Sequence, residues 1–172
     1  LGLGPDWFKE GETSMSHRHV SSLQFTYSML DQDPATRFFP IAQTEKTGLI
    51  TRTPHAFGLL DGTYTKNSLL APIDSSSSLD QEWLEQGIEK LSCLDFLKEG
   101  LRSTIGQIAI KFALSGSQIA TVLPNILNLE QLEEFAATSE TDDIPQEFLN
   151  RIQELNEQNF YLQPVHQSSV TS

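Results

Sequence analysis

The sequence is poor in cysteine, in basic residues and in long apolar runs, and each shortage excludes a class of protein. Cys93 is the only cysteine in 172 residues, so no internal disulfide can form and a reducing compartment, the cytoplasm, is expected. The 11 lysines and arginines face 23 aspartates and glutamates, a net charge of −12, which argues against nucleic acid and anionic membranes as partners. No apolar run approaches the ~20 residues that cross a bilayer.

Common catalytic motifs are also absent. The sequence contains neither the G-x-S-x-G turn of a serine nucleophile nor the G-x-x-x-x-G-K loop that holds nucleotide phosphates. His17 and His19 form an H-x-H pair, but no further ligand lies near them in the sequence, and a structural zinc ion needs four ligands. No metal site is therefore predicted.

Apolar periodicity predicts an alternation of strands and helices. No two predicted strands are joined by a tight hairpin turn, so the connections must be crossovers and the sheet parallel. A further helix within residues 5–19 is expected to lie across the bottom of the fold, and the serine-rich end of the 55–78 loop is interpreted as a flexible connector. The predicted strands cover residues 1–4, 20–28, 48–53 and 119–123, and the predicted helices cover residues 34–46, 79–99, 104–114 and 129–138, followed by a last helix that begins at Pro145.

Cap residues and buried positions can be assigned along these helices. Asp33 and Asn128 are predicted N-caps, since short polar side chains accept hydrogen bonds from the first free amides of a helix. In the helix after Asn128, Leu132 and Phe135 are expected to face inward. Cys93 lies beside an apolar stripe and is interpreted as a packed residue, not a nucleophile.

The most informative stretch is the strand at residues 48–53 and the loop behind it. Pro54 lacks an amide donor and must end the strand, so Arg52 and Thr53 project from its carboxyl end. In parallel α/β folds that edge carries the chemistry, because its loops vary while the sheet stays fixed. His55 follows, and it is interpreted either as loop packing or as the edge of a cofactor site.

Three blocks of this sequence resemble, in the same order, the aldo-keto reductases. Residues 58–64 resemble the loop after the family's strand seven, residues 23–28 resemble strand six, and residues 119–134 resemble strand eight with its helix. The resemblance implies that residues 1–162 form the carboxyl-terminal half of a (β/α)8 TIM-type barrel, an α/β fold with parallel strands and crossover helices, and that residues 163–172 are a polar tail. A half-barrel leaves open sheet edges, so a missing amino-terminal half, on the same or a separate chain, is the expected partner.

The family reduces carbonyl compounds with a nicotinamide dinucleotide. Its catalytic Asp, Tyr, Lys and His come from the first four strands, so the resemblance implies the cofactor-binding half of an NAD(P)H-dependent oxidoreductase of small carbonyl substrates, with no catalytic residue in this chain. Whether the complete protein is an enzyme therefore stays open at this point.

The resemblance also implies which residues bind the cofactor. Gln24 stands where the family holds the nicotinamide carboxamide, and an amide suits that task because it both donates and accepts. Arg52 stands where many members stack an aromatic ring on nicotinamide, although an ion pair with an acidic neighbour is the alternative role. Thr53 is expected near the pyrophosphate. The segment after the last strand would bind the adenosine end through Asn125, Gln131 and Glu134.

Two points stay open from the sequence. No lysine or arginine lies between Pro124 and Glu134, so the choice between NADP and NAD is not decided. Two other functions also compete with the reductase, namely a non-catalytic binding or regulatory protein that keeps the barrel, and a half-barrel interaction module that associates with itself through its open edges.

Overall fold

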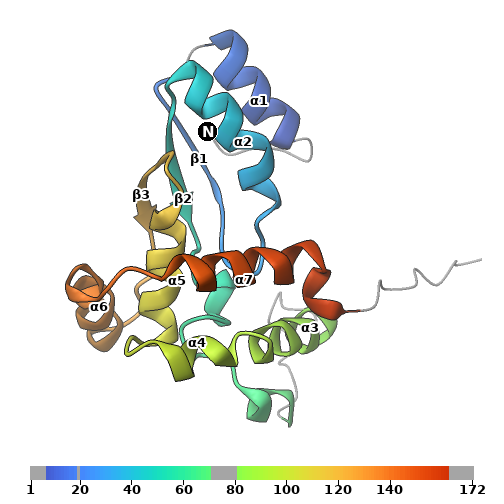
Figure 1. The fold of residues 1–172 in the computed structure, drawn as a ribbon, viewed down its shortest axis with the longest axis vertical. Coiled ribbons are helices and arrows are strands. Elements are labelled where there is room, and N and C mark those ends of the chain that lie inside the picture. The colour runs from blue at the N-terminus through green and yellow to red at the C-terminus, as the bar shows by residue number, and fades with distance from the viewer. Residues whose placement is uncertain (1–6, 19, 71–80, 163–172) are drawn as a thin grey trace, which may run out of the picture.

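The computed structural model describes residues 7–18, 20–70 and 81–162. In this part of the chain, strands β1 (Ser22–Thr26), β2 (Gly48–Arg52) and β3 (Ile119–Leu123) form one parallel sheet in the order β1-β2-β3 (Figure 1). The α/β fold with crossover connections is thus confirmed. The predicted strand at residues 1–4, the serine run and the tail from Gln163 lie outside the described residues.

The sheet has one covered face, which carries the core. Leu23 and Phe25 alternate along β1, as a half-buried strand requires, and Tyr27 continues the alternation directly after it; all three are buried. The ring of Phe25 meets Phe38 edge-on at 5.2 Å, and Tyr27 stacks on Phe112 at 5.5 Å. Because Phe38 belongs to α2 (Asp33–Glu45) and Phe112 to α5 (Ile105–Ser115), these two helices cover this face of the sheet.

The first helix, α1 (Trp7–Arg18), lies in a place the sequence did not indicate. It packs beside α2 rather than across the bottom of the fold (Figure 1). The contact is close because a Cβ added at Gly11 would lie 2.7 Å from the ring of Phe38, and only a glycine leaves room there. The expectation of a helix within residues 5–19 is therefore right, and its expected position is wrong.

Helix α2 begins at Asp33, the residue predicted to be its cap. Its N-cap is Gln32, whose side chain makes no capping hydrogen bond, and Asp33 is instead the first residue of the helix. Pro34 fits in the first turn because amides there have no partner within the helix. Pro40 lies inside the helix, which continues through it and ends at Lys46 in a left-handed conformation with φ of 56°.

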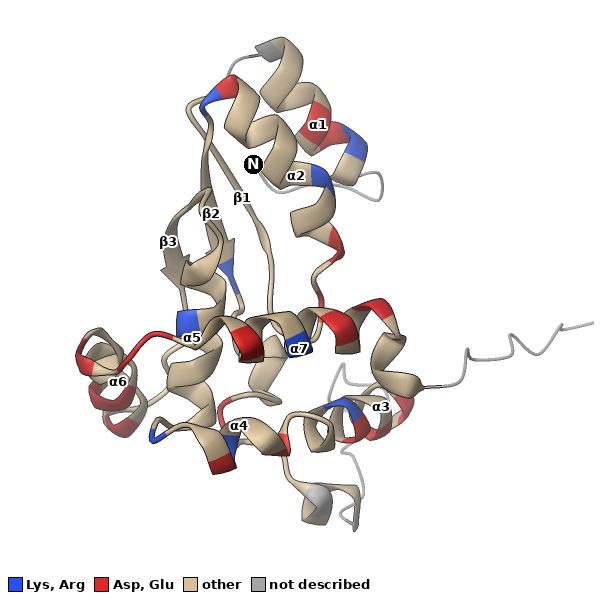
Figure 2. Cartoon of the chain, viewed as in Figure 1, with Lys and Arg blue, Asp and Glu red and all other residues tan. Residues whose placement is uncertain are grey.

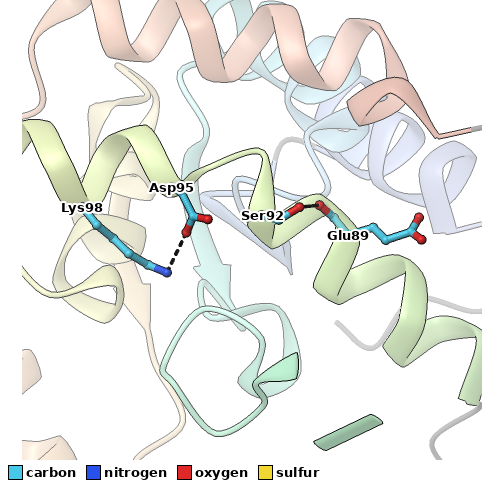
Figure 3. A network of polar contacts seen from close by, with 4 residues as sticks. All are labelled: Glu89, Ser92, Asp95 and Lys98. Carbon is cyan, nitrogen blue, oxygen red and sulfur yellow. Dashed lines mark hydrogen bonds and ion pairs between the residues drawn. The ribbon is translucent and has the colours of Figure 1, made fainter. Parts of the chain in front are cut away.

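The single helix predicted at residues 79–99 is two helices, α3 (Gln81–Ser92) and α4 (Asp95–Gly100). The chain turns at Cys93 and Leu94, whose amides bond to the carbonyls three residues earlier. Figure 3 shows polar contacts on both sides of this turn, where the Ser92 hydroxyl donates to the Glu89 carbonyl and Lys98 pairs with Asp95. The turn allows Leu94 and Leu97 to be fully buried, and that tertiary contact overrides the helical spacing.

The last helices follow the prediction more closely. Thr104 caps α5 and forms a capping box with Gln107, and Asn128 caps α6 (Leu129–Ala136) by accepting a hydrogen bond from the Gln131 amide. Phe135 is buried as expected, but Leu132 is 46% exposed, so its predicted inward orientation is wrong. Helix α7 (Gln146–Glu157) starts after Pro145 and is followed by a 3₁₀ turn, Asn159–Tyr161.

Candidate functional site

The face of the sheet opposite the core is accessible. We call it the open face and define it by five of the side chains that share two neighbouring rows of the sheet and one orientation; Leu123, which is paired with Arg52, is the sixth. Gln24 is paired in register with Ile50, and Ile50 with Thr121, while Thr26 is paired with Arg52. Not one of these five side chains is buried. Alternation with the buried residues of β1 and β2, together with the pairing of Thr121 with Ile50, places them on this face: Gln24, Thr26, Ile50, Arg52 and Thr121.

Gln24 and Arg52 therefore lie on the same face of adjacent strands, Gln24 in the middle of β1 and Arg52 at the carboxyl end of β2. Arg52 is exposed and Gln24 partly exposed, so both side chains are open to a ligand. Within the described part of the chain Arg52 forms no ion pair, and the alternative role as a structural ion pair is not realised there. The guanidinium at the end of β2 and the amide in the middle of β1 offer donors and one acceptor to a planar carboxamide.

The loop after β2 is held in a conformation that ordinary residues seldom adopt. Thr53, Ala56 and Phe57 have φ values of 53°, 47° and 57°, in the left-handed region. Thr53 turns its hydroxyl back to the Arg52 carbonyl at 2.8 Å. Such conformations cost roughly 1–3 kcal/mol each and concentrate at functional loops. The sequence shows Pro54 but gives no sign of this strain, because these residue types fit many loops.

His55 is a packing residue of this loop. Its ring is buried and stacks on Phe135 of α6 with centroids 4.2 Å apart. Since the Gly106 carbonyl oxygen can only accept, the Nε2–H of His55 donates to it at 3.1 Å. Nδ1 has no hydrogen-bond partner among the described residues. Of the two interpretations of His55, the structure supports packing.

Replacing His55 with leucine is expected to reduce the pH dependence of stability. Burial lowers the pKa of His55 below its ordinary 6.5, so the unfolded chain binds the proton more readily than the folded one. The contribution of neutral His55 is therefore complete above about pH 6.5 and is lost as the pH falls toward the lowered pKa. Urea denaturation measures the free energy of unfolding at about pH 7.5 and about pH 5.5. Between these two pH values it should fall more in wild type than in His55→Leu. Equal losses would contradict this assignment.

The segment after β3 uses its predicted binding residues partly for its own structure. The Oε1 of Gln131 accepts from the Leu127 amide at 2.9 Å, and the carboxylate of Glu134 accepts from the hydroxyl of Thr104 on the neighbouring helix. Asn125 is exposed and forms no hydrogen bond within the described residues. The cofactor contacts of Asn125, Gln131 and Glu134 thus stay predictions. One side-chain oxygen of Gln131 and one of Glu134 already accept a hydrogen bond from within the chain.

A cavity of about 500 Å³ lies at the same edge of the sheet, where β1 and β2 end. Tyr27 and Thr53 line it from the two strand ends, and Trp83 lines it from α3. Burial raises the pKa of Tyr27, which is the opposite of what a proton donor near neutral pH requires. Sequence reasoning missed this cavity because four segments distant in the chain form its walls. In the described residues no group of three or more potential ligands could hold a metal ion.

Comparison with known proteins decides the family. The model of the aldo/keto reductase family matches residues 13–157. The chain belongs to the aldo/keto reductase family. It is 27% identical over 106 residues to a probable voltage-gated potassium channel subunit beta of Arabidopsis thaliana, an alignment that covers 58% of this chain and 32% of that protein.

Solved aldo-keto reductases share the fold. The holo form of AKR11C1 from Bacillus halodurans is 22% identical with a TM-score of 0.62 over 90% of this chain, and the glycerol dehydrogenase AKR11B4 from Gluconobacter oxydans is 10% identical with a TM-score of 0.67 over 88%. This chain spans only 48% and 46% of those two proteins. The three parallel strands and their helices are thus part of an aldo-keto reductase barrel. No helix in the described ranges is long and apolar enough to span a membrane.

Proposed function

We propose that this chain is the cofactor-binding half of an NAD(P)H-dependent aldo-keto reductase that reduces a small carbonyl compound. One observation carries the proposal: Gln24 and Arg52, from adjacent strands, share the open face, and Arg52 lies at the carboxyl end of β2, the edge where parallel α/β folds bind ligands. The bound dinucleotide would supply a hydride to the carbonyl carbon. The chain would supply the groups that hold its nicotinamide ring.

The residues fit the nicotinamide end of the cofactor. The amide of Gln24 can donate to and accept from the carboxamide, as a matched pair of hydrogen bonds. The planar guanidinium of Arg52 can lie flat against the ring, and its charge would favour the neutral reduced form over the cationic oxidised form. Thr53 follows at the strand end, where a hydroxyl or a backbone amide can reach the pyrophosphate.

The open face requires a cover. A sheet with one face accessible and β3 at its edge is costly to leave in water. We propose that the amino-terminal half of the barrel, on the same or a separate polypeptide, closes against it and brings the catalytic Asp, Tyr, Lys and His. We refer to this assembly as the completed barrel. A cytoplasmic location is part of the same proposal and is supported by the single cysteine.

Fluorescence titration tests the proposal directly. The completed barrel is expected to bind NADPH or NADH with an increase in nicotinamide emission. Adenosine diphosphate, which lacks the nicotinamide ring, should displace the dinucleotide only weakly. A completed barrel that binds neither dinucleotide would refute the cofactor role.

A regulatory binding protein is the second candidate. The similarity to a protein named as a probable potassium channel subunit favours it. In that case the completed barrel would bind nicotinamide dinucleotide and also a partner protein, but would not oxidise NADPH in the presence of aldehydes. Dinucleotide binding with steady turnover of an aldehyde would decide for the reductase.

The preference between NADP and NAD can be changed at one position. The side chain of Leu127 is 80% exposed beside the start of α6, which carries Glu130, Glu133 and Glu134 and no basic residue (Figure 2). Leu127→Arg would offer a cation to a 2′-phosphate, so we expect NADPH affinity to rise about tenfold relative to NADH. Titration of both dinucleotides measures the ratio. Leu114→Arg, which changes an exposed leucine of α5, is the control. If both variants have the same ratio of NADPH affinity to NADH affinity, the proposed adenosine site is wrong.

A further inference from the structure

The side chain of His55 connects three elements of the fold. His55 belongs to the loop after β2, and its Nε2–H donates to the Gly106 carbonyl oxygen in the first turn of α5. Its ring stacks on Phe135 of α6 with an angle of 27° between the two planes. Only 3% of His55 is exposed. One imidazole ring therefore holds the loop against α5 and α6 at the same time, and we call these contacts the His55 joint.

The two helices of the His55 joint are close together. A Cβ added at Gly106 would lie 2.9 Å from the ring of Phe135 and 2.9 Å from Oε1 of Glu134, so a larger residue there would push α6 away from α5. The side chain of Gln107 on α5 also donates to the Glu134 carbonyl oxygen at 3.0 Å. The helices are thus fixed to each other, and His55 attaches the loop after β2 to the pair.

The backbone of His55 fixes the loop itself. Its carbonyl oxygen accepts hydrogen bonds from the amides of Gly58 at 3.1 Å and Leu60 at 3.0 Å. Thr53 and Ala56, on either side of it, have the left-handed conformation, which persists only where the surroundings enforce it. The contacts of the His55 ring with two helices provide that enforcement.

The His55 joint connects the two parts of the chain proposed to hold the phosphate and adenosine ends of the cofactor. Thr53, two residues before His55, begins the loop that would reach the pyrophosphate. Gln131 and Glu134 of α6 would contact the adenosine. Because the ring of His55 lies against α6, it sets the position of the loop relative to that helix.

Protonation of His55 would weaken the joint. Nδ1 is buried and has no hydrogen-bond partner among the described residues, so a proton placed there would have no acceptor. The charged groups that act on the ring are Asp61 of the same loop and Glu134 of α6, while α5 presents the Gly106 carbonyl group. Their attraction is weaker than the effect of burial, which lowers the pKa of His55 below 6.5. Acid is therefore expected to loosen the contact between the loop and the helices.

We propose that His55 is a positioning residue for the cofactor. In its neutral form it holds the loop after β2 against α5 and α6, and it thereby aligns the groups that bind the pyrophosphate with those that bind the adenosine. This role of His55 depends on the proposed cofactor role of the chain. It does not involve Gln24 or Arg52, which would contact the nicotinamide ring.

Binding of ADP-ribose to the completed barrel tests this role. ADP-ribose keeps the adenosine and the pyrophosphate, and it lacks both the nicotinamide and the 2′-phosphate, a further group that titrates in acid. It should bind more weakly than a complete dinucleotide. Calorimetry is expected to show that the affinity of wild type falls about three- to tenfold between about pH 7.5 and about pH 5.5. His17→Gln, which changes an exposed histidine of α1, is the control and should show the same fall.

Two variants of His55 separate positioning from packing. Glutamine can donate to the Gly106 carbonyl oxygen and does not titrate, so His55→Gln should keep most of the wild-type affinity at the higher pH and lose the fall in acid. Leucine cannot donate, so His55→Leu should bind ADP-ribose about three- to tenfold more weakly at the higher pH, again without the fall in acid. Gly106→Ala displaces α6 from α5 and should weaken binding by a similar factor. Circular dichroism at both pH values confirms that each variant is folded.

Two results would overturn the role of His55. One is a fall in affinity with pH that is as large in folded His55→Gln and His55→Leu as in wild type. The other is an affinity at the higher pH that is equal in wild type, His55→Leu and Gly106→Ala. If wild type binds neither ADP-ribose nor a complete dinucleotide, the proposed cofactor role fails and the role of His55 fails with it, so the two failures are distinguishable.

Discussion

Replacing Gln24 and Arg52 together by methionine is expected to weaken nicotinamide dinucleotide binding by the completed barrel about 100-fold, close to 3 kcal/mol. Gln24 would lose paired hydrogen bonds to the carboxamide, which contribute about 0.5–1.5 kcal/mol each. Arg52 would lose the contact of its guanidinium plane with the ring. Methionine matches the length of the glutamine side chain and keeps the unbranched first part of the arginine side chain, so the loss reports mainly on polar contacts and charge.

A matched control addresses effects on folding. The double variant Gln153→Met and Arg102→Met changes the same residue types at exposed positions outside the sheet, and its affinity should equal that of wild type. The dissociation constant is obtained from nicotinamide fluorescence for each dinucleotide. If the variant that carries both Gln24→Met and Arg52→Met binds the dinucleotide as tightly as this control, the open face does not hold the nicotinamide.

Replacing Phe38 with alanine is expected to lower the free energy of unfolding by about 3–5 kcal/mol. Phe38 has no exposed surface and lies at the centre of the contact between α1, α2 and β1. Its ring is 5.7 Å from Trp7, 5.8 Å from Phe8 and 5.2 Å from Phe25. Removing it would leave a cavity that neighbours on three elements cannot all move to fill.

Urea or guanidinium denaturation followed by circular dichroism measures this loss. Phe57→Ala is the control, because that ring is 60% exposed and its removal should cost less than about 1 kcal/mol. A loss in Phe38→Ala no larger than in Phe57→Ala would mean that α1 and α2 do not pack on the sheet as the structure shows.

The strands could be predicted because their signals are local. Leu23, Phe25 and Tyr27 alternate with polar residues, and Pro54 and Pro124 end the second and third strands of the sheet. The strand at residues 119–123 has the predicted bounds. Caps such as Asn128 were also predictable, since a short polar side chain and a nearby amide suffice to form them.

The features that were missed depend on tertiary contacts. The leucines at 91, 94 and 97 would suit one continuous helix, yet the chain turns at Leu94 to bury it fully. Leu132 is apolar and at a helical spacing from Phe135, but the described part of the chain leaves it 46% exposed. The interaction of His55 with Gly106 joins residues 51 positions apart, and no sequence pattern marks it.

The cofactor contacts of the candidate site stay predictions, and only part of its geometry could be foreseen. The placement of Gln24 and Arg52 on one face follows from strand alternation, which the sequence contains, and from the register of β1 with β2, which only the structure gives. The internal bonds of Gln131 and Glu134 could not be foreseen, because they involve the Leu127 amide and the side chain of Thr104.

A crystal structure of the completed barrel with bound NADPH or NADH tests the central claim most directly. We predict that the Gln24 side-chain amide lies about 3 Å from the nicotinamide carboxamide, within hydrogen-bond distance, and that the Arg52 guanidinium lies against the ring. A dinucleotide bound elsewhere, or an open face filled by apolar side chains of the other half with Gln24 sealed beneath them, would contradict it.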